Sequence, residues 1–498
     1  MKTMDDILIQ RYANAFNIPY ELACIISKRF PDYNEAKKFL YPEIDHLKNP
    51  LELPDIQKAV EILIEGIKNN ENILIYTHDD PDGYTSATLL YQTLLDIRRK
   101  GSPYIFIYPI NREKDGYVLN PEVLKEYIEK GVKILVTVDF GISNPKNFEV
   151  ARELGLRLVI CDHHETDFNE FLVPAVDPKR KDSKYPFREL AGVGVTLKLC
   201  QMIYKTAFGI NDRDFFKLKK EFTAIAMIGT LADRVMPLDE NRIICYEGLK
   251  AFREIDKPWA RHFLTDNSIN IPYIFNEIIP LLQSAALEDS QLGIDFFISP
   301  DFLKVVEKLK SIENARKENI EYLFQIALNV AKVYPNIVIS VIPYEAINEK
   351  QKTKINNLGA VVSKLRDNFH KTAVAMIIKE GKCYAELRSY DINLFEFLNR
   401  SKELFIDFGG HRRAAGFSMF EKFLDKFVDY ATKMLPEPTI ENKKKMEPEA
   451  IIDKSKIKLL EPLLPFGEGN PSPLLTDGID LYTIDNRLNI IEIGLWQT

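Results

Sequence analysis

The sequence has few cysteines and no long apolar segment. Its five cysteines are scattered over 498 residues without a C-x-x-C pair. This argues against a disulfide framework or a structural zinc knot and fits a reducing compartment. No run of about 18 apolar residues is present, so we expect no membrane-spanning helix. The first residues also lack the basic-then-apolar pattern of a signal peptide, and we therefore predict a soluble cytoplasmic protein.

An excess of basic residues is absent as well. The net charge is −7, although charged residues make up 28% of the chain. A protein that coats nucleic acid without selectivity would have a basic surface, so that class is disfavoured. A nucleic-acid enzyme stays open if its basic groups are concentrated in one groove. The length exceeds what one core supports, and we expect roughly two to four domains.

The most informative stretch runs from Thr77 to Ser86 and contains His78, Asp79, Asp80 and Asp82. An apolar, β-branched run precedes it and a leucine-rich helical pattern follows it, which indicates strand, acidic turn and helix. Crowded carboxylates raise each other's pKa and repel, and bound manganese, magnesium or zinc would relieve that repulsion. For an isolated turn, a solvated acidic loop that caps a helix is the simpler interpretation.

The same arrangement recurs at two later strands, which changes that interpretation. A buried-strand pattern at 133–138 ends on Asp139, and another at 156–161 ends on Asp162, His163 and His164. Strands alternate with helices from residue 71 to about 240, which predicts a doubly wound parallel sheet. Because the carboxyl ends of parallel strands share one edge, these side chains can converge, and metal binding becomes the favoured interpretation.

Two helical features follow. Ala191–Val195 is rich in small residues that allow close helix packing or a close backbone approach. The apolar helix Phe222–Leu231 is followed by Asp233, and the helix macrodipole disfavours a carboxylate at that end. A partner should hold Asp233 there, and a metal would do so.

The second half of the chain is typical of a long connecting helix followed by another α/β unit. Phe302–Val333 is charged and amphipathic throughout. The α/β unit contains Arg388, Ser389 and the segment 409–413, in which two glycines precede a histidine and two arginines. Such a segment is a candidate phosphate cradle, although most Gly-Gly pairs mark ordinary turns. Pro436–Pro448 looks like a linker, and about 50 β-rich residues follow it.

Together these motifs resemble the RecJ family of single-strand-specific exonucleases, within the DHH phosphoesterase superfamily. The resemblance covers nearly the whole chain and keeps the family order. The matching segments are His78–Ser86, Thr137–Asp139, Asp162–His164, Ala191–Gly194, Gly229–Asp233, Arg388–Ser389, Gly409–His411 and Pro465–Pro471.

The chain also departs from the family pattern. His78 stands where bacterial members usually carry Asp, and Leu282–Ala286 replaces a segment that contains asparagine and arginine. The resemblance implies an α/β fold of five parts. These are a helical N-terminal segment at 1–70, a DHH catalytic domain at 71–300, a connecting helix at 301–335, a DHH-associated substrate-binding domain at 336–435, and a short OB-like segment at 450–498.

The resemblance further implies a 5′ to 3′ exonuclease for single-stranded DNA in repair and recombination. Hydrolysis would use two Mn²⁺ or Mg²⁺ ions, bridged by Asp82 or Asp139. The expected metal residues are His78, Asp80, Asp82, Asp139, His163 and Asp233. The expected catalytic residues are Asp80, Asp82, Asp139, His163 and His164, where His164 contacts the phosphate or orients a ligand. The expected phosphate-binding residues are Arg388, Ser389, Gly409, Gly410 and His411.

Other functions stay open at this point. One alternative is a DHH phosphodiesterase for short oligonucleotides or cyclic dinucleotides, and another is a non-catalytic replication scaffold on the same fold. Pyrophosphatase activity would predict a more compact chain. Expected partners are single-stranded DNA and a single-strand-binding protein or helicase, with no membrane contact and a monomeric state.

Overall fold

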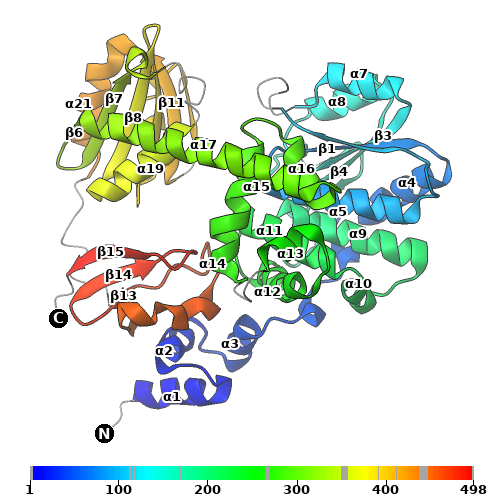
Figure 1. The fold of residues 1–498 in the computed structure, drawn as a ribbon, viewed down its shortest axis with the longest axis horizontal. Coiled ribbons are helices and arrows are strands. Elements are labelled where there is room, and N and C mark those ends of the chain that lie inside the picture. Colours follow the sequence, from blue (N-terminus) through cyan, green and yellow to red (C-terminus); the bar gives the residue numbers. More distant parts are fainter. Residues whose placement is uncertain are drawn as a thin grey trace. The chain divides into compact units, whose positions relative to one another are not determined.

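The computed structural model describes residues 4–111, 115, 118–168, 170–264, 269–348, 357–390, 392–410, 412–436 and 447–495. The chain divides into two compact units (Figure 1). The first unit comprises Met1–Lys310 with Glu447–Thr498, and the second comprises Ser311–Met446. In the described part of the chain, no helix is long and apolar enough to cross a bilayer.

The first unit is built on a five-stranded, all-parallel sheet with the order β2-β1-β3-β4-β5. The predicted doubly wound parallel sheet is therefore confirmed. β2 lies on one side of β1 and β3 on the other, so the strand order reverses between β1 and β3. In open parallel sheets, ligands bind at such a reversal, in the crevice beyond the carboxyl ends of the strands. The strands are β1 (Asn72–Thr77), β2 (Ile105–Pro109), β3 (Val132–Val138), β4 (Arg157–Cys161) and β5 (Ala175–Val176).

Helices cover both faces of this sheet, as a parallel sheet requires. α7 (Pro121–Glu129) and α8 (Lys146–Glu153) pack over one face, where Leu74, Leu135 and Leu158 are buried. α4 (Ile56–Lys68), α5 (Pro81–Ile97) and α9 (Gly192–Phe208) lie on the other face (Figure 1). Because both faces are covered, the strands are continuous apolar runs.

The rest of the first unit is mostly helical. Its other helices are α1 (Met4–Phe16), α2 (Tyr20–Arg29), α3 (Tyr33–Leu40), α10 (Asp212–Leu218), α11 (Lys220–Asp233), α12 (Asp239–Glu254), α13 (Pro258–Phe263), α14 (Ile271–Tyr273), α15 (Ile279–Ala285) and α16 (Gln291–Ile298). A small sheet, in the order β12-β13-β14-β15, completes the unit. Its strands are β12 (Ala450–Ile451), β13 (Leu475–Thr476), β14 (Asp480–Ile484) and β15 (Ile490–Leu495).

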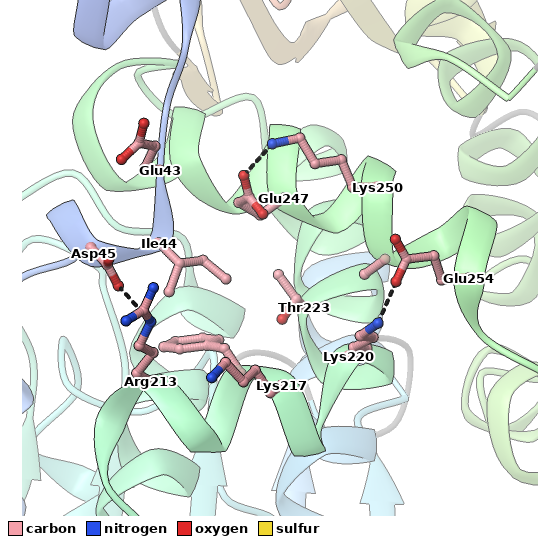
Figure 2. Close-up of a pocket in the computed structure, with 12 residues that line it drawn as sticks. Glu43, Ile44, Asp45, Arg213, Lys217, Lys220, Thr223, Glu247, Lys250 and Glu254 are labelled. Carbon is pink, nitrogen blue, oxygen red and sulfur yellow. Dashed lines mark hydrogen bonds and ion pairs between the residues drawn. The ribbon is translucent and has the colours of Figure 1, made fainter.

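A surface pocket opens beside the amino-terminal end of α11, where Thr223 lies at its floor (Figure 2). Its cationic side chains face carboxylates: Lys250 lies 2.6 Å from Glu247, and Arg213 lies 3.7 Å from Asp45. Thr223 precedes Asp233 by ten residues, which corresponds to about 15 Å of helix. The pocket is thus separate from the edge of the sheet where the predicted metal residues lie.

The second unit contains a six-stranded mixed sheet in the order β10-β11-β9-β8-β7-β6. α17 (Phe302–Asn329) and α19 (Leu358–Phe369) pack on one face, and α20 (Leu394–Asn399) and α21 (Leu424–Met434) pack on the other. The strands are β6 (Ala331–Val333), β7 (Ile337–Pro343), β8 (Thr372–Lys379), β9 (Lys382–Arg388), β10 (Asp407–Gly410) and β11 (Ala414–Phe420).

One predicted element ends earlier than expected. The long helix was predicted to reach Val333, but α17 ends at Asn329, and residues 331–333 form the edge strand β6. Ala331 pairs with Ser340 and Val333 with Val338 in an antiparallel ladder. Pairing with β7 therefore overrides the helical pattern there. Most of the predicted linker Pro436–Pro448, namely residues 437–446, lies outside the described residues.

Candidate metal centre

The acidic turn after β1 is held by a helix cap. Asp80 has an extended backbone and precedes Pro81, the first residue of α5, where proline suits a helix start. One oxygen of Asp80 accepts the Gly83 N–H at 2.9 Å, and the other lies 2.8 Å from Nδ1 of His78. A Cβ at Gly83 would lie 2.4 Å from the His78 carbonyl oxygen, so this tight turn requires glycine. His78 and Asp80 are therefore positioned together.

Asp82 is held by a second helix. Its carboxylate accepts the N–H of Gly192 at 2.7 Å and the N–H of Val193 at 2.9 Å, both at the first turn of α9. The positive end of a helix dipole stabilises such a carboxylate. Asp82 is only 1% exposed. The small residues at 192–194 thus bring backbone donors to Asp82, which is one of the two roles that the sequence left open.

Asp139 directly follows β3 and has a strained backbone conformation. Its φ is +55°, in the left-handed region that few residues other than glycine adopt. The side chain is buried, and its Oδ1 accepts no hydrogen bond of ordinary geometry, although Nε2 of His163 lies 3.2 Å from it. A Cβ at Gly192 would lie 2.5 Å from that oxygen. A strained and unsatisfied carboxylate with a bare glycine beside it is typical of a functional site.

The segment after β4 presents two histidines through one aspartate. The Asp162 carboxylate accepts the Ile142 N–H at 2.9 Å and the His163 N–H at 2.7 Å, and it lies 2.7 Å from Nδ1 of His164. Burial would raise the pKa of Asp162, but the His164 imidazole and these donors lower it well below its usual range. Asp162 therefore holds the backbone of His163 and the ring of His164 in place.

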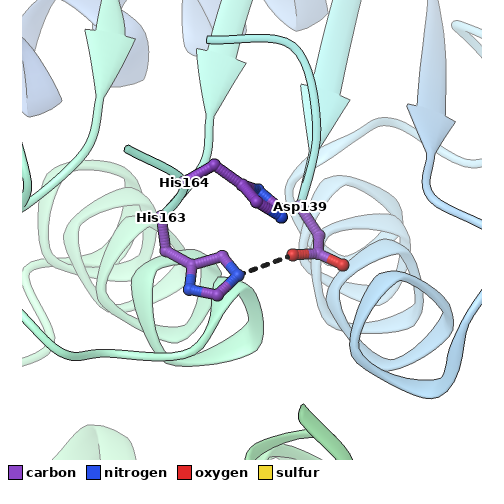
Figure 3. Close-up of side chains that lie close together, drawn as sticks. All are labelled: Asp139, His163 and His164. Atoms are coloured by element: carbon purple, nitrogen blue, oxygen red, sulfur yellow. Dashed lines mark ion pairs between the residues drawn. The ribbon is translucent and has the colours of Figure 1, made fainter. Parts of the chain in front are cut away.

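His163 points into a group of carboxylates. Its Nε2 lies 3.2 Å from Oδ1 of Asp139, as Figure 3 shows, and 3.6 Å from Oδ2 of Asp233. Burial would lower the pKa of His163, but Asp233, Asp82 and Asp162 outweigh it and raise the pKa. Asp233 is the last residue of α11, and its side chain is 27% exposed. The carboxylate at this helix end thus faces the histidine.

Three sets of donor atoms overlap at this edge of the sheet. The atoms of each set lie within 4.8 Å of one another, and Asp139 and His163 each belong to two sets. Burial and the neighbouring carboxylates raise the pKa of Asp82 and of Asp139 far above the ordinary value. A divalent cation would remove that repulsion, and oxygen and imidazole donors suit manganese or magnesium. The sets are Asp139, His163 and His164; His78, Asp80 and Asp139; and Asp82, His163 and Asp233.

The predicted phosphate-binding residues lie in the second unit. Arg388 ends β9, and its guanidinium lies 2.8 Å from the Glu386 carboxylate. Gly409 and Gly410 lie on β10, and β11 pairs with both strands. A Cβ at Gly410, where φ is +133°, would lie 2.5 Å from the Ala414 carbonyl oxygen, whereas Gly409 has open space beside it. Arg388 and the glycines thus belong to one stretch of sheet.

Two of these residues need separate comment. Ser389 is 2% exposed, and its hydroxyl lies 3.0 Å from that of Thr372 and accepts the Ile392 N–H. Its side chain therefore shapes the chain after β9 and does not face solvent. His411 lies outside the described residues.

Sequence reasoning did not assign a site role to several residues that build this centre. Asp162 was noted as a strand-end carboxylate, but its orienting role depends on amides from another loop. Gly229 was noted only as part of a matching segment, and its packing was not expected: a Cβ there would lie 2.2 Å from the Thr85 hydroxyl and 2.9 Å from Asp82. The signal in both cases is a close approach between elements distant in sequence, which periodicity does not reveal.

Comparison with known proteins agrees with this geometry. Residues 72–230 match the DHH family, N-terminal domain, and residues 335–437 match the DHHA1 domain. The strand order, the aspartates at strand ends and the paired histidines thus define a DHH phosphoesterase.

Similar curated proteins indicate which DHH phosphoesterases this chain resembles. The chain is 28% identical over 417 residues to the single-stranded-DNA-specific exonuclease RecJ of Bacillus subtilis, covering 80% of this chain and 50% of that protein. It is 28% identical over 420 residues to RecJ of Escherichia coli, covering 77% and 70%. The chain therefore belongs to the DHH/DHHA1 phosphoesterases as a RecJ-like member.

The fold agrees with a solved structure of this family. The crystal structure of RecJ in complex with Mn²⁺ from Thermus thermophilus superposes with a TM-score of 0.72 at 20% identity. The match covers 98% of this chain and 72% of that chain. The chain spans about half the length of the B. subtilis protein and about 70% of the E. coli one.

Proposed function

We propose that this protein is a 5′ to 3′ exonuclease that hydrolyses phosphodiesters of single-stranded DNA with two Mn²⁺ or Mg²⁺ ions. The observation that carries the proposal is the overlap of three donor sets through Asp139 and His163. One metal ion would account for one set, whereas shared ligands are what a pair of ions needs. The names of the curated relatives support single-stranded DNA as the substrate.

Each site residue has a proposed role. His78 and Asp80 would hold one ion, and His163, Asp82 and Asp233 would hold the other. Asp139 would serve both, because it belongs to one donor set with His78 and to another with His163. When bound, the ions supply Lewis acidity at the phosphodiester and activate water. His164, whose side chain is 50% exposed and whose Nδ1 lies 2.7 Å from Asp162, would contact the substrate phosphate.

The second unit would bind the strand end. Arg388 and the backbone N–H groups of Gly409 and Gly410, with His411 beside them, hold the terminal phosphate. Ser389 would act as a positioning residue, because its buried hydroxyl is engaged with Thr372. Holding the terminal phosphate fixes the polarity of cleavage.

We also propose the domain roles given by the sequence. Residues 71–300 carry the chemistry, 336–435 bind substrate, and 301–335 connect them. The segments 1–70 and 450–498 flank the catalytic domain, the latter as a short OB-like part.

The decisive experiment uses 5′-labelled and 3′-labelled single strands of about 5 and about 50 nucleotides with Mn²⁺. The inactive control is Asp139→Asn, since asparagine tolerates the left-handed conformation that Asp139 adopts. We expect mononucleotides from the 5′ end of the long strand, and none from the control. Cleavage confined to the short strand would favour a small-oligonucleotide phosphodiesterase, and no cleavage with any metal would favour a scaffold.

A further inference from the structure

A short loop follows Asp233 and connects α11 to α12. Asp233 ends α11, Arg234 turns the chain with a φ of +60°, and α12 begins at Asp239. We call residues 234–238 the metal-site loop. Because Asp233 lies at the junction of helix and loop, a shift of the loop moves its oxygens relative to His163, which is 3.6 Å away.

A turn from the far end of the chain packs on this loop. Residues 467–470, the C-terminal turn, are closed by hydrogen bonds of 3.0 and 3.2 Å between Gly467 and Asn470. A Cβ at Gly467 would lie 2.9 Å from Cδ of Pro237. A Cβ at Gly469, where φ is +76°, would lie 2.8 Å from Cδ1 of Leu238. A side chain at Gly467 would thus push against the rigid Pro237 ring, whereas one at Gly469 would meet the movable end of Leu238 and strain the backbone.

Hydrogen bonds of the Asn470 side chain hold the C-terminal turn in place. Asn470 is fully buried, and its amide donates to the carbonyls of Leu463 at 2.7 Å and Pro465 at 2.8 Å. Its oxygen accepts a hydrogen bond from Arg29 at 2.7 Å, and the same guanidinium pairs with Glu449. These contacts leave the turn little freedom to retreat from the loop.

A buried arginine fixes the chain just before the turn. Arg242 of α12 donates to the carbonyls of Pro462 at 2.7 Å and Leu464 at 3.0 Å and lies over the Phe39 ring. The metal-site loop is tied to the same helix, since Asn241 donates to the Met236 carbonyl at 2.9 Å. The loop and the turn are thus both anchored to α12.

We infer that the C-terminal turn is a positioning element for Asp233, so that the segment after the second unit sets metal affinity in addition to any role in gripping a strand. This inference rests on the proposed role of Asp233 as a metal ligand. Groups that orient a metal ligand typically change affinity about 10–100-fold when altered. The same size of effect is expected from a side chain that separates turn and loop.

The test measures Mn²⁺ affinity of the full chain by the loss of the free-ion electron paramagnetic resonance signal. Gly467→Ala should weaken Mn²⁺ binding about tenfold or more, because the new methyl group meets the Pro237 ring. The matched control is Gly478→Ala in the same small sheet, where φ is +98° and nothing lies within 4 Å of the added Cβ. It strains the segment without touching the loop and should leave the affinity unchanged.

A second-site variant separates positioning from general damage. In Gly467→Ala with Pro237→Ala the ring atoms that clash are gone, so the affinity should return to within about threefold of wild type. If Gly467→Ala does not fold, Arg29→Gln loosens the turn from a distance and should weaken binding by a smaller factor. Melting temperatures in EDTA show that the variants are folded.

The outcomes are distinct. Equal Mn²⁺ affinity of wild type and Gly467→Ala would overturn the inference while leaving the metal centre intact. A double variant no better than Gly467→Ala would also overturn it. Failure of the wild type to bind Mn²⁺ would instead overturn the proposed function.

Discussion

The ammonium of Lys198 lies 2.6 Å from the carboxylate of Glu240, and neither side chain reaches solvent. Lys198 belongs to α9, whose first turn donates to Asp82, and Glu240 belongs to α12. Glu240 also accepts the Tyr185 hydroxyl at 2.6 Å and the Lys48 N–H at 2.7 Å. This buried network ties α12 to α9, the helix whose first turn holds Asp82.

Removing one partner of this pair should be costly. Lys198→Met leaves Glu240 buried without its cation, and we expect a loss of about 3–5 kcal/mol in unfolding free energy. Urea denaturation followed by tryptophan fluorescence measures it, because Trp259 is buried in the first unit. Adding Glu240→Gln should recover part of the loss, since glutamine still accepts from Tyr185.

A surface pair provides the control for that series. Lys250 and Glu247 lie 2.6 Å apart, but the lysine side chain is 58% exposed. Lys250→Met should change stability by less than about 1 kcal/mol. A loss in Lys198→Met no larger than this would show that the buried pair contributes little.

Gly192→Ala should damage the metal centre without unfolding the protein. The added methyl group would lie 2.5 Å from Asp139 Oδ1, and a displacement of this kind can reduce the rate about 100-fold. The control is Gly194→Ala in the same helix, where the nearest atom is the flexible tip of Leu190 at 3.1 Å. Initial rates of Mn²⁺-dependent hydrolysis compare the two, and equal rates would contradict the proposed geometry.

Asp139→Asn should be more stable than wild type when metal is removed. The change takes away one of several mutually repelling buried carboxylates, and asparagine keeps the backbone conformation. Thermal melts in EDTA should therefore show a higher midpoint for the variant. Saturating Mn²⁺ should stabilise wild type by about 2.7 kcal/mol at roughly 100 times Kd and the variant far less. Equal stabilisation of both proteins would exclude Asp139 as a ligand.

The Arg180–Asp55 pair predicts a pH dependence. Arg180 lies 2.5 Å from Asp55, and both side chains are largely buried. Burial would raise the pKa of Asp55, but hydrogen bonds from Lys58 and Arg180 lower it. A lowered carboxyl pKa contributes stability above the unfolded value, near 4, and that stability is lost as the pH falls through the folded value.

Asp55→Asn is the variant that measures this contribution. It should be less stable than wild type by about 1.5–3 kcal/mol at pH 7, and the gap should narrow below about pH 4. Urea denaturation at pH 7, 5, 4 and 3 follows it. Asp45→Asn, at a carboxylate 57% exposed and 3.7 Å from Arg213, should behave like wild type throughout. A gap for Asp55→Asn that stays constant at low pH would exclude the carboxylate as its source.

Arg388→Gln tests the terminal phosphate site. Losing a charge-assisted hydrogen bond to phosphate should lower kcat/KM about 10–100-fold on 5′-phosphorylated strands and leave 5′-hydroxyl strands nearly unchanged. Arg400→Gln, at an arginine that follows α20 directly in the same unit and is 62% exposed, should alter neither rate. An equal effect of Arg388→Gln on both substrates would exclude Arg388 as a ligand of the terminal phosphate.

The sequence predicted those parts of the site that depend on local pattern. Each strand that leads to Asp80, Asp139 or His163 is an apolar run ending in polar residues, and parallel topology forces such ends together. The fold class is confirmed on this basis. Which ligand binds which ion stays a prediction.

Other features depend on packing between distant segments. Asp82 lies 110 residues from the amides that hold it, and Arg242 lies 220 residues from Pro462. Contacts between residues so far apart in the sequence produce no periodic pattern from which they could be predicted. The end of the long helix was also missed, because residues 331–333 have a helical pattern but find a strand partner in β7.

The first unit is discontinuous in sequence, since Glu447–Thr498 completes a body whose main part ends at Lys310. A ribosome therefore makes all of Ser311–Met446 before that body can close. At about 5–20 residues per second, this interval lasts on the order of ten seconds. Throughout it, Arg242 lacks the carbonyls of Pro462 and Leu464, and the metal-site loop lacks the turn that packs on it. If the C-terminal turn positions Asp233 as proposed, a nascent chain acquires its full metal affinity only after Glu447–Thr498 has been made.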